Sequence, residues 1–358
     1  MHGSVRSRLA QHPSRFVQLI RRLFWMWRDD RRAKGSLVRK VPYWLRGFRI
    51  GSAEMYGFPR PDERDYFDDY HATFRIKGLN ASLAFYQHKL AQRALLLASG
   101  FPQTPMVAVI WDGRVVLHPL TGSGEPASPK RLREWLLRDG GRYIVKPEDG
   151  GRGSAIWLLE ARDGALVCRR GRREEPFPPA ELVDRLTLIE RYMEQAEFWQ
   201  VLFPGTLNTI RLLTLWPAGG RPFLARACQR IGAADTLPCD NASAGGISAE
   251  IDLVTGEMGP GRRRRDGYQP LFHHPDSGAR IDGAVLPRWT AIRDTALRAA
   301  ATMPMNCYVG WDVFVDASGS IIIGEASGST GVGVYQVHRG LLADPMVRRF
   351  FQEAGVLR

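Results

Sequence analysis

A lysine followed by a glycine-rich run is the first feature of the sequence whose residues could do chemistry. The run at 143–154 (YIVKPEDGGRGS) places Lys146 on a short predicted strand, just ahead of Gly150, Gly151 and Gly153. Backbone N–H groups of such glycines can converge on a phosphate, and the lysine adds a positive charge beside them. The run is not a Walker A loop, because its lysine precedes the glycines. The alternative is a plain hairpin that carries a lysine on one strand.

Two carboxylates near the C-terminus form the second feature. The segment 310–327 is predicted to be two strands joined by a turn at 316–319 (DASG), with Asp312 early on the first strand and Glu325 ending the second. Antiparallel pairing would bring both carboxylates together. Such a pair is costly within apolar strands that hold no lysine or arginine between them, unless a cation binds it. Mg²⁺ uses one or two carboxylates together with substrate phosphates. The alternative is two carboxylates at strand ends that face water.

A second lysine is a candidate site residue only because of its position along the chain. Residues 82–98 show helical spacing of apolar residues, followed by Gly100 and Pro102, which are typical helix-ending residues. This pattern places Lys89 midway along the predicted helix. Taken alone, Lys89 would be a solvated helix residue.

The elements that must position these residues are strands interspersed with helices, many of them joined as hairpins. This indicates an α+β architecture built on antiparallel sheet. Residues 51–75 are predicted to be irregular, and 104–118 to be a strand pair. Helices are predicted at 130–137 and about 287–303, and further strands at 143–146, 155–159, 186–192, 209–215, 223–231, 247–253, 309–315 and 321–325.

Composition excludes several classes of protein. The four cysteines lie far apart and form no CxxC pair, so they predict neither a disulfide framework nor a zinc site and favour a reducing cytoplasm. No apolar run approaches the ~20 residues of a membrane span. Of the net charge of +13, residues 1–50 contribute +11, from thirteen Lys or Arg against two Asp. The other 308 residues are therefore close to neutral, which argues against a nucleic-acid partner.

The basic N-terminal region contains one segment with two open interpretations. Segment 15–28 (RFVQLIRRLFWMWR) mixes aromatic and aliphatic residues with arginines. A helix of this composition could lie on an anionic membrane surface with its aromatic face down. Alternatively, the aromatic stripe packs against the body of the protein and the arginines are solvated.

In their order along the chain, these features resemble the ATP-grasp superfamily. That superfamily has a lysine on a helix ending in Gly-x-Pro, a strand lysine with a glycine-rich loop, a hinge strand and a final acidic hairpin. Here the hinge is at 188–194 (LIERYME). Further blocks resemble the branch called sugar-transfer associated ATP-grasp: 207–211 (LNTIR), 240–246 (DNASAGG), 251–256 (IDLVTG), 274–278 (HPDSG) and 286–289 (LPRW). The resemblance covers roughly residues 80–345 and leaves out the first eighty.

The resemblance implies ATP and Mg²⁺ as cofactors, with a role for each site residue. Lys89 and Lys146 would contact the ATP phosphates, and Gly150, Gly151 and Gly153 would fold over them as a lid. Glu190 and Met193 frame the adenine, largely through backbone groups. Arg211 and Arg230 steady the transferring phosphate or a substrate anion, with Asn241 in a loop nearby. Asp312, Glu325 and Ser327 hold Mg²⁺, although the superfamily usually has Asn where this chain has Ser327.

The resemblance also implies a reaction. Most members form an acyl phosphate from ATP and a substrate carboxylate, which an amine or thiol then attacks. We therefore expect a cytoplasmic ligase of small-molecule carboxylates and amines, serving cell-surface polysaccharide or secondary-metabolite synthesis, with membrane contact through 15–28 left open. The alternatives are a kinase of a sugar or other hydroxyl, a non-catalytic nucleotide-binding protein, and nucleic-acid binding through the four arginines at 262–265 and the basic arm. Such an arginine loop more often forms a solvated surface or faces a substrate anion. The expected division is a basic extension at 1–79, a leading α/β segment at 80–135, a lid subdomain at 136–195 and a large subdomain at 196–358.

Overall fold

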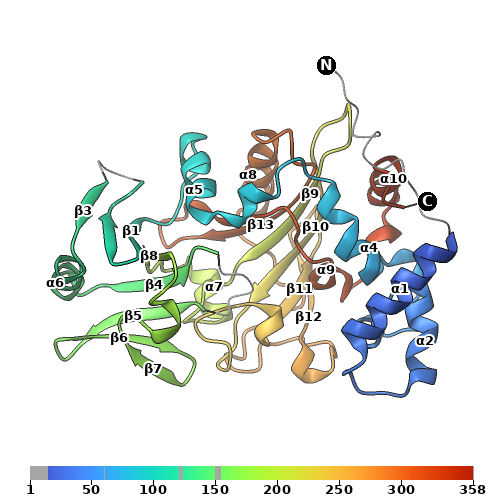
Figure 1. The fold of residues 1–358 in the computed structure, drawn as a ribbon, viewed down its shortest axis with the longest axis horizontal. Coiled ribbons are helices and arrows are strands. Elements are labelled where there is room, and N and C mark those ends of the chain that lie inside the picture. The colour runs from blue at the N-terminus through green and yellow to red at the C-terminus, as the bar shows by residue number, and fades with distance from the viewer. Residues whose placement is uncertain (1–14, 60, 121–123, 150–154, 358) are drawn as a thin grey trace.

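Two antiparallel sheets form the centre of the chain, as the computed structural model shows for residues 15–59, 61–120, 124–149 and 155–357 (Figure 1). The strands are Met106–Trp111 (β1), Arg114–Leu117 (β2), Glu125–Ala127 (β3), Arg142–Pro147 (β4), Trp157–Arg162 (β5), Ala165–Arg170 (β6), Arg173–Pro176 (β7), Thr187–Arg191 (β8), Ile210–Leu215 (β9), Phe223–Ile231 (β10), Ile247–Ile251 (β11), Met258–Arg262 (β12), Tyr308–Val315 (β13) and Ile321–Ser327 (β14). The α+β prediction is confirmed.

Helices flank both sheets. They are Arg15–Asp30 (α1), Leu37–Arg46 (α2), Ile50–Tyr56 (α3), Asp69–Phe74 (α4), Lys89–Ala98 (α5), Pro129–Asp139 (α6), Glu197–Leu202 (α7), Trp289–Ala301 (α8), Gly333–Gln336 (α9) and Pro345–Glu353 (α10). Short 3₁₀ turns lie at Glu63–Asp65 (η2), Ile76–Gly78 (η3), Ala84–Gln87 (η4), Ala180–Leu182 (η5), Ala242–Ala244 (η6), Arg264–Asp266 (η7) and Leu341–Ala343 (η8). No helix in these described ranges is both long and apolar enough to cross a bilayer.

One sheet, drawn mostly in green in Figure 1, has eight strands in the order β3-β2-β1-β8-β4-β5-β6-β7. We call it the small sheet because its strands are only three to six residues long. Side chains alternate along β4, so Tyr143 and Val145 point into a core with Trp157 while Lys146 points to the other face. The strand pair predicted in 104–118 belongs to this sheet, because β1 pairs with β8. The boundary expected at residue 135 therefore falls between strands that share one sheet.

The other sheet has six strands in the order β12-β11-β10-β9-β13-β14 and carries a core on each face. We call it the large sheet because its strands are longer, from five to nine residues. On one face, Ile210 and Leu212 of β9 pack with α8 residues such as Ile292. On the opposite face, Leu213 and its neighbours pack with Phe351 of α10. Both faces are thus covered along most of the sheet.

A short segment after β8 connects the two sheets. Gln195 forms a bridge with Asp316 in the turn between β13 and β14, and the Ala317 N–H donates to the Glu194 carbonyl at 2.9 Å. The Ala196 N–H donates to the Val315 carbonyl at 3.0 Å. These backbone bonds tie the predicted hinge to the large sheet, so the end of β8 is fixed beside β13.

The N-terminal region corrects two predictions. Residues 51–75 are not irregular: they contain α3, η2 and α4, and the Asp68 carboxylate caps α4 by accepting from the His71 N–H at 3.0 Å. The helix predicted over 82–98 is also shorter, because His88 has extended backbone angles (φ −112°, ψ 92°) after the turn η4. Lys89 is therefore the first residue of α5, not a residue midway along it.

A buried asparagine holds together the loop before β9. Asn208 is fully buried, and its Nδ2 donates to the Trp199 and Phe203 carbonyls at 2.9 and 2.7 Å. Its Oδ1 accepts from the Gly232 N–H at 3.0 Å, and its own N–H donates to Gln195 Oε1 at 2.7 Å. The Asn208 side chain thus satisfies buried backbone groups of two separate segments, and Gln195 holds its backbone N–H, which together fix where β9 begins.

Asn208→Ala would leave the buried Phe203 carbonyl and the buried Gly232 N–H without these partners, whereas the Trp199 carbonyl would still accept from the Phe203 N–H at 3.1 Å. We expect the free energy of unfolding to fall by about 3 kcal/mol, because each unsatisfied buried group costs about 1–3 kcal/mol. Urea unfolding followed by circular dichroism measures the change. The exposed Gln269→Ala is the matched control. Equal stability of the two variants would contradict this role for Asn208.

Candidate active site

A cavity of about 790 Å³ lies between the two sheets and collects most of the predicted site residues. Nine of them line it: Lys89, Lys146, Glu190, Arg211, Arg230, Asn241, Asp312, Glu325 and Ser327. Met193 is not among the lining residues. Gly150, Gly151 and Gly153 lie outside the residues that the structure describes. The two lysines and the acidic pair, which are distant in sequence, thus face one cavity.

The register of the large sheet explains why its polar residues share one face. Asp312 lies directly opposite Arg211 of β9 on one side and Glu325 of β14 on the other. Residues that lie opposite one another in antiparallel strands point to the same face. Arg230 is two residues beyond Cys228, which pairs with Arg211, so it joins the same face.

Asp312 is held by two arginines. Its Oδ2 accepts from Arg211 Nη2 at 2.7 Å and from Arg230 Nη1 at 3.1 Å, and its Oδ1 accepts from Arg211 Nε. Arg211 Nη1 also donates to Thr330 Oγ1 at 2.7 Å. No lysine or arginine lies between the two carboxylates within the hairpin itself, but the neighbouring strands β9 and β10 supply two arginines. Asp312 does not require a metal ion to offset its burial.

The network continues into the loop after β10. Arg230 Nη2 donates to Asp240 Oδ1 at 2.5 Å and to Asn241 Oδ1. Asp240 Oδ2 in turn accepts from the Thr209 N–H at 2.8 Å. Arginines and aspartates alternate along this chain of contacts, and Asn241 is fixed at the cavity wall as its last member.

The charges in this network hold one another ionised. Burial alone would raise the pKa of Asp312, but Arg211 and Arg230 outweigh burial and keep that pKa below its usual range. Burial alone would lower the pKa of Arg211, and Asp312 reverses this and raises it. The Asp312 carboxylate and both guanidinium groups are therefore charged at neutral pH.

The opposite wall of the cavity contains a second buried ion network. Lys146 Nζ lies 2.8 Å from Glu190 Oε1, and Arg93 Nη2 of α5 lies 2.8 Å from Glu190 Oε2. Burial lowers the pKa of Lys146, and Glu190 opposes that shift. Burial would raise the pKa of Glu190, but Arg93 and Lys146 hold it below its usual range. The Glu190 side chain is thus used within the protein, and its backbone lies in the sheet opposite Ile144 of β4 and Met106 of β1.

Lys89 enters the cavity from the start of α5. Its Nζ donates to the Glu148 carbonyl at 2.9 Å, just ahead of the glycine-rich run. Glu148 Oε1 lies 3.4 Å from the Leu90 N–H and 3.7 Å from His88 Nδ1. A carboxylate at a helix N-terminus is stabilised by the unpaired N–H groups there. These contacts join α5 to the end of β4, so that Lys89 and Lys146 face the same cavity.

The donor set at Asp312 and Glu325 fits Mg²⁺ bound together with phosphates. A carboxylate has about four lone-pair sites, and the arginines occupy three of those on Asp312, which leaves one on Oδ1. Glu325 lies directly opposite, and Ser327 also lines the cavity. The described residues contain no group of three His, Cys, Asp or Glu that could hold a metal ion. Mg²⁺ characteristically takes its remaining ligands from phosphates and water.

Several residues of the site were not identified from the sequence. Arg93 pairs with Glu190, 97 residues away, and no local pattern indicates this contact. Asp240 pairs with Arg230 across a loop; it lies in the block 240–246 that carries the family resemblance, but no role was assigned to it. Arg262 and Arg264 line the cavity wall. The arginine run at 262–265 was the available signal for these last two.

The comparisons place the chain in a class and then in a family. Its fold is the ATP-grasp fold. The family model described as "Sugar-transfer associated ATP-grasp" matches residues 89–348, and the chain belongs to this family. No curated protein matches the chain.

Three similar solved structures are distant in sequence. One is N5-carboxyaminoimidazole ribonucleotide synthetase from Thermotoga maritima, at 12% identity over 72% of this chain and 49% of that one, with a TM-score of 0.36. A second is D-alanyl-alanine synthetase A from Vibrio cholerae, at 11% identity over 76% and 65%, with a TM-score of 0.44. A third is the ATP-grasp ligase PsnB with a precursor peptide and AMPPNP, at 14% identity over 77% and 62%, with a TM-score of 0.40. The chain thus spans less than two thirds of each of these relatives.

Glu190→Gln would leave Arg93 and Lys146 buried without their counter-charge. We expect the free energy of unfolding to fall by about 3–5 kcal/mol. Glu194→Gln, four residues along, removes an exposed partner of Arg142 and should change stability by less than about 1 kcal/mol. Urea titration of both variants measures the difference. A Glu190→Gln protein as stable as Glu194→Gln would contradict the buried triad.

The lowered pKa values of Asp312 and Glu190 set the direction of the pH dependence. Below the unfolded-state values, near pH 4, the unfolded chain binds more protons than the native state, so stability is present above this range and lost as pH falls. We expect Asp312→Asn to be less stable at pH 7 but to lose less further stability than wild type between about pH 5 and pH 2. Denaturant unfolding at a series of pH values tests this, with the exposed Asp184→Asn as control. Parallel curves for wild type and Asp312→Asn would exclude the effect.

Proposed function

We propose that this protein is an ATP- and Mg²⁺-dependent ligase that activates a substrate carboxylate as an acyl phosphate and joins it to an amine or thiol. The observation that carries the proposal is the single cavity shared by Lys89 and Lys146 on one side and by Asp312 and Glu325 on the other. Cations and carboxylates on facing walls suit a triphosphate, whose own charge is negative and whose magnesium ion is positive.

The proposed reaction has two steps. A substrate carboxylate oxygen attacks the γ-phosphorus of ATP, the bond to the β–γ bridging oxygen breaks, and ADP leaves. The amine then attacks the acyl carbon, phosphate leaves, and the nitrogen loses a proton. Phosphoryl transfer depends on positioning and charge neutralisation, which fixed cations supply without a covalent enzyme intermediate.

The residues divide this work between the two walls. Lys89 and Lys146 neutralise phosphate oxygens from the side of the small sheet. Asp312, Glu325 and Ser327 would hold Mg²⁺, which offsets the charge of the phosphates when it is bound. Arg211 and Arg230, aligned by Asp312, present guanidinium edges toward the transferring group. Because the two arginines are already fixed, little reorganisation is needed when charge develops.

Two further arginines support an anionic substrate. Arg262 and Arg264 line the cavity at the end of β12 and in η7. Arg262 donates through Nη1 to the Tyr268 carbonyl at 2.7 Å, and Arg264 is exposed. Arginines on the wall of the cavity suit the carboxylate of the acid to be activated.

Lys89→Ala should lower kcat/KM for ATP about 10²-fold, because it removes one cation aimed at the phosphates. The side chain of Lys130 is 86% exposed on α6, so Lys130→Ala serves as a charge-matched control with unchanged kinetics. ADP release under steady-state conditions measures both variants. Equal activity of the two variants would remove Lys89 from the proposed site.

Product analysis with candidate carboxylates, ATP and Mg²⁺ tests the reaction itself. We expect ADP and phosphate, together with a hydroxamate when hydroxylamine replaces the amine. AMP and pyrophosphate would refute the acyl-phosphate route. A phosphorylated product that resists hydroxylamine would instead identify a kinase of a hydroxyl group. No nucleotide turnover with any acceptor would favour a non-catalytic nucleotide-binding protein.

A further inference from the structure

The first helix leaves an apolar stripe uncovered. Phe16, Ile20, Phe24 and Trp27 of α1 are 70%, 50%, 61% and 44% exposed. Their spacing of four, four and three residues places them on one face of the helix. Large apolar side chains in such a row are costly in water, so the row indicates a surface that something else covers.

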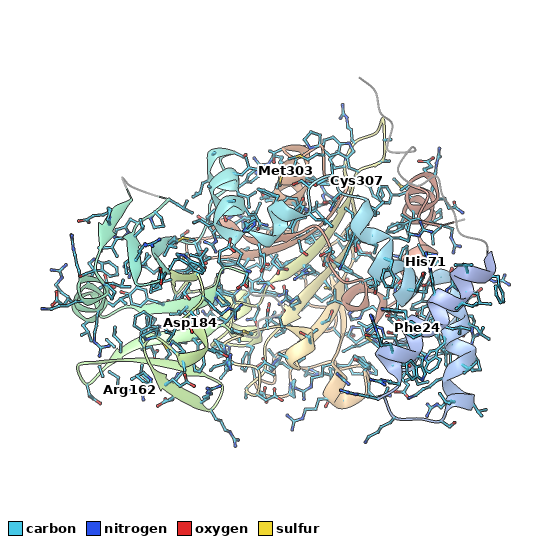
Figure 2. The ribbon with its side chains drawn as sticks, in the orientation of Figure 1. Phe24, His71, Arg162, Asp184, Met303 and Cys307 are labelled. Atoms are coloured by element: carbon cyan, nitrogen blue, oxygen red, sulfur yellow. The ribbon has the colours of Figure 1, made fainter. Side chains whose placement is uncertain are left out.

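The second helix has the same property. Val38 of α2 is 85% exposed and Leu37 is 59% exposed, and Val41 and Leu45 follow at helical spacing with 38% and 45% exposure. Helices α1 and α2 pack against each other at the edge of the molecule that lies away from the small sheet (Figure 1). Figure 2 shows Phe24 on this edge, at the opposite end from Arg162 and Asp184. We call this pair the N-terminal hairpin.

The exposed stripes are not the faces that dock the hairpin to the protein. Other residues of the same helices do that: Trp25, Met26 and Trp44 are buried together. Asp30 Oδ2 accepts from Trp44 Nε1 at 2.8 Å and from the Ile50 N–H at 2.9 Å. Segment 15–28 thus has two different faces: one packs on the body of the protein, as the second interpretation expects, and the other stays uncovered.

The charge around the stripes identifies the partner. Exposed basic residues surround the two helices: Arg21, Arg28, Arg31, Arg32, Lys34, Arg39 and Arg46. Two of them have acidic partners, since Arg39 pairs with Glu54 at 3.1 Å and Arg46 with Glu63 at 2.6 Å. Asp29 and Asp30 are the acidic residues of 15–50; Asp30 is buried and Asp29 pairs with Arg49 at 3.1 Å. An apolar face rimmed by Arg and Lys matches a bilayer with anionic headgroups. A second copy of the chain would instead bring two basic rims together.

We propose that the N-terminal hairpin docks on an anionic lipid bilayer surface, with Phe24, Trp27 and Val38 entering the boundary between headgroups and acyl chains. The docked hairpin is continuous with the cavity wall, because α3 packs on α2 and contributes Met55 to the lining. Membrane docking would thus hold the cavity near the bilayer. This surface is separate from the residues of the proposed reaction, so the two proposals can fail independently.

Vesicle co-sedimentation of the full chain tests the docking. We expect the protein to bind vesicles of phosphatidylcholine mixed with phosphatidylglycerol and to stay in solution with phosphatidylcholine alone, with binding weakened by salt. Phe24→Ser with Trp27→Ser should lower the partition coefficient about tenfold or more. Arg28→Glu with Arg32→Glu should lower the partition coefficient about 25-fold or more, since each basic residue near the surface contributes about fivefold.

Matched controls keep the test specific. Val254 is 82% exposed and Arg221 is exposed, and both lie in turns between strands of the large sheet, so Val254→Ser and Arg221→Glu should bind vesicles like wild type. Unchanged thermal unfolding confirms that each variant is folded, and light scattering reports its oligomeric state. Wild type that ignores anionic vesicles, or hairpin variants that bind like the controls, would overturn the proposal. If light scattering shows a wild-type dimer that dissociates in both hairpin variants, the surface binds a second copy of the chain. That result would also overturn the proposal.

Discussion

The site depends on one carboxylate that two arginines hold in a fixed position. Asp312 lies opposite Arg211 in the register of the large sheet, and Arg230 reaches it from the next strand. Placing three charged groups in a buried position is costly, and the mutual attraction of such groups rarely exceeds that cost. A network of this kind is therefore poor evidence that it stabilises the fold, and better evidence that the positions of its charged groups matter. It fixes where the guanidinium edges point within the cavity.

The second ion network gives the cavity its opposite wall. Glu190 holds Lys146 of the small sheet and Arg93 of α5, and the segment after β8 is bonded to the turn between β13 and β14. The small sheet is thereby positioned against the large one through α5 and this segment. Each wall is rigid because its charges are paired, and the space between them is left for a ligand whose own charges are both negative and positive.

The sequence predicted the elements of the large sheet better than the contacts between charges. Strands such as β13 and β14 are largely apolar and are separated by turn residues, so their pattern was sufficient. The opposition of Asp312 and Glu325 follows from the hairpin between them. The start of α5 at Lys89 was missed, because the apolar spacing before it continues through a 3₁₀ turn. Helices α3 and α4 were missed because they are only seven and six residues long and depend on tertiary packing. The pairings of Arg93 and Asp240 join residues far apart or across a loop, which local pattern does not encode.

An experimental structure with a non-hydrolysable ATP analogue and Mg²⁺ tests the central claim most directly. The account predicts a triphosphate in the cavity between the two sheets, with Lys89 and Lys146 at its oxygens and the metal ion beside Asp312 and Glu325. A nucleotide bound elsewhere on the protein, or a cavity that takes none at saturating concentration, would contradict it.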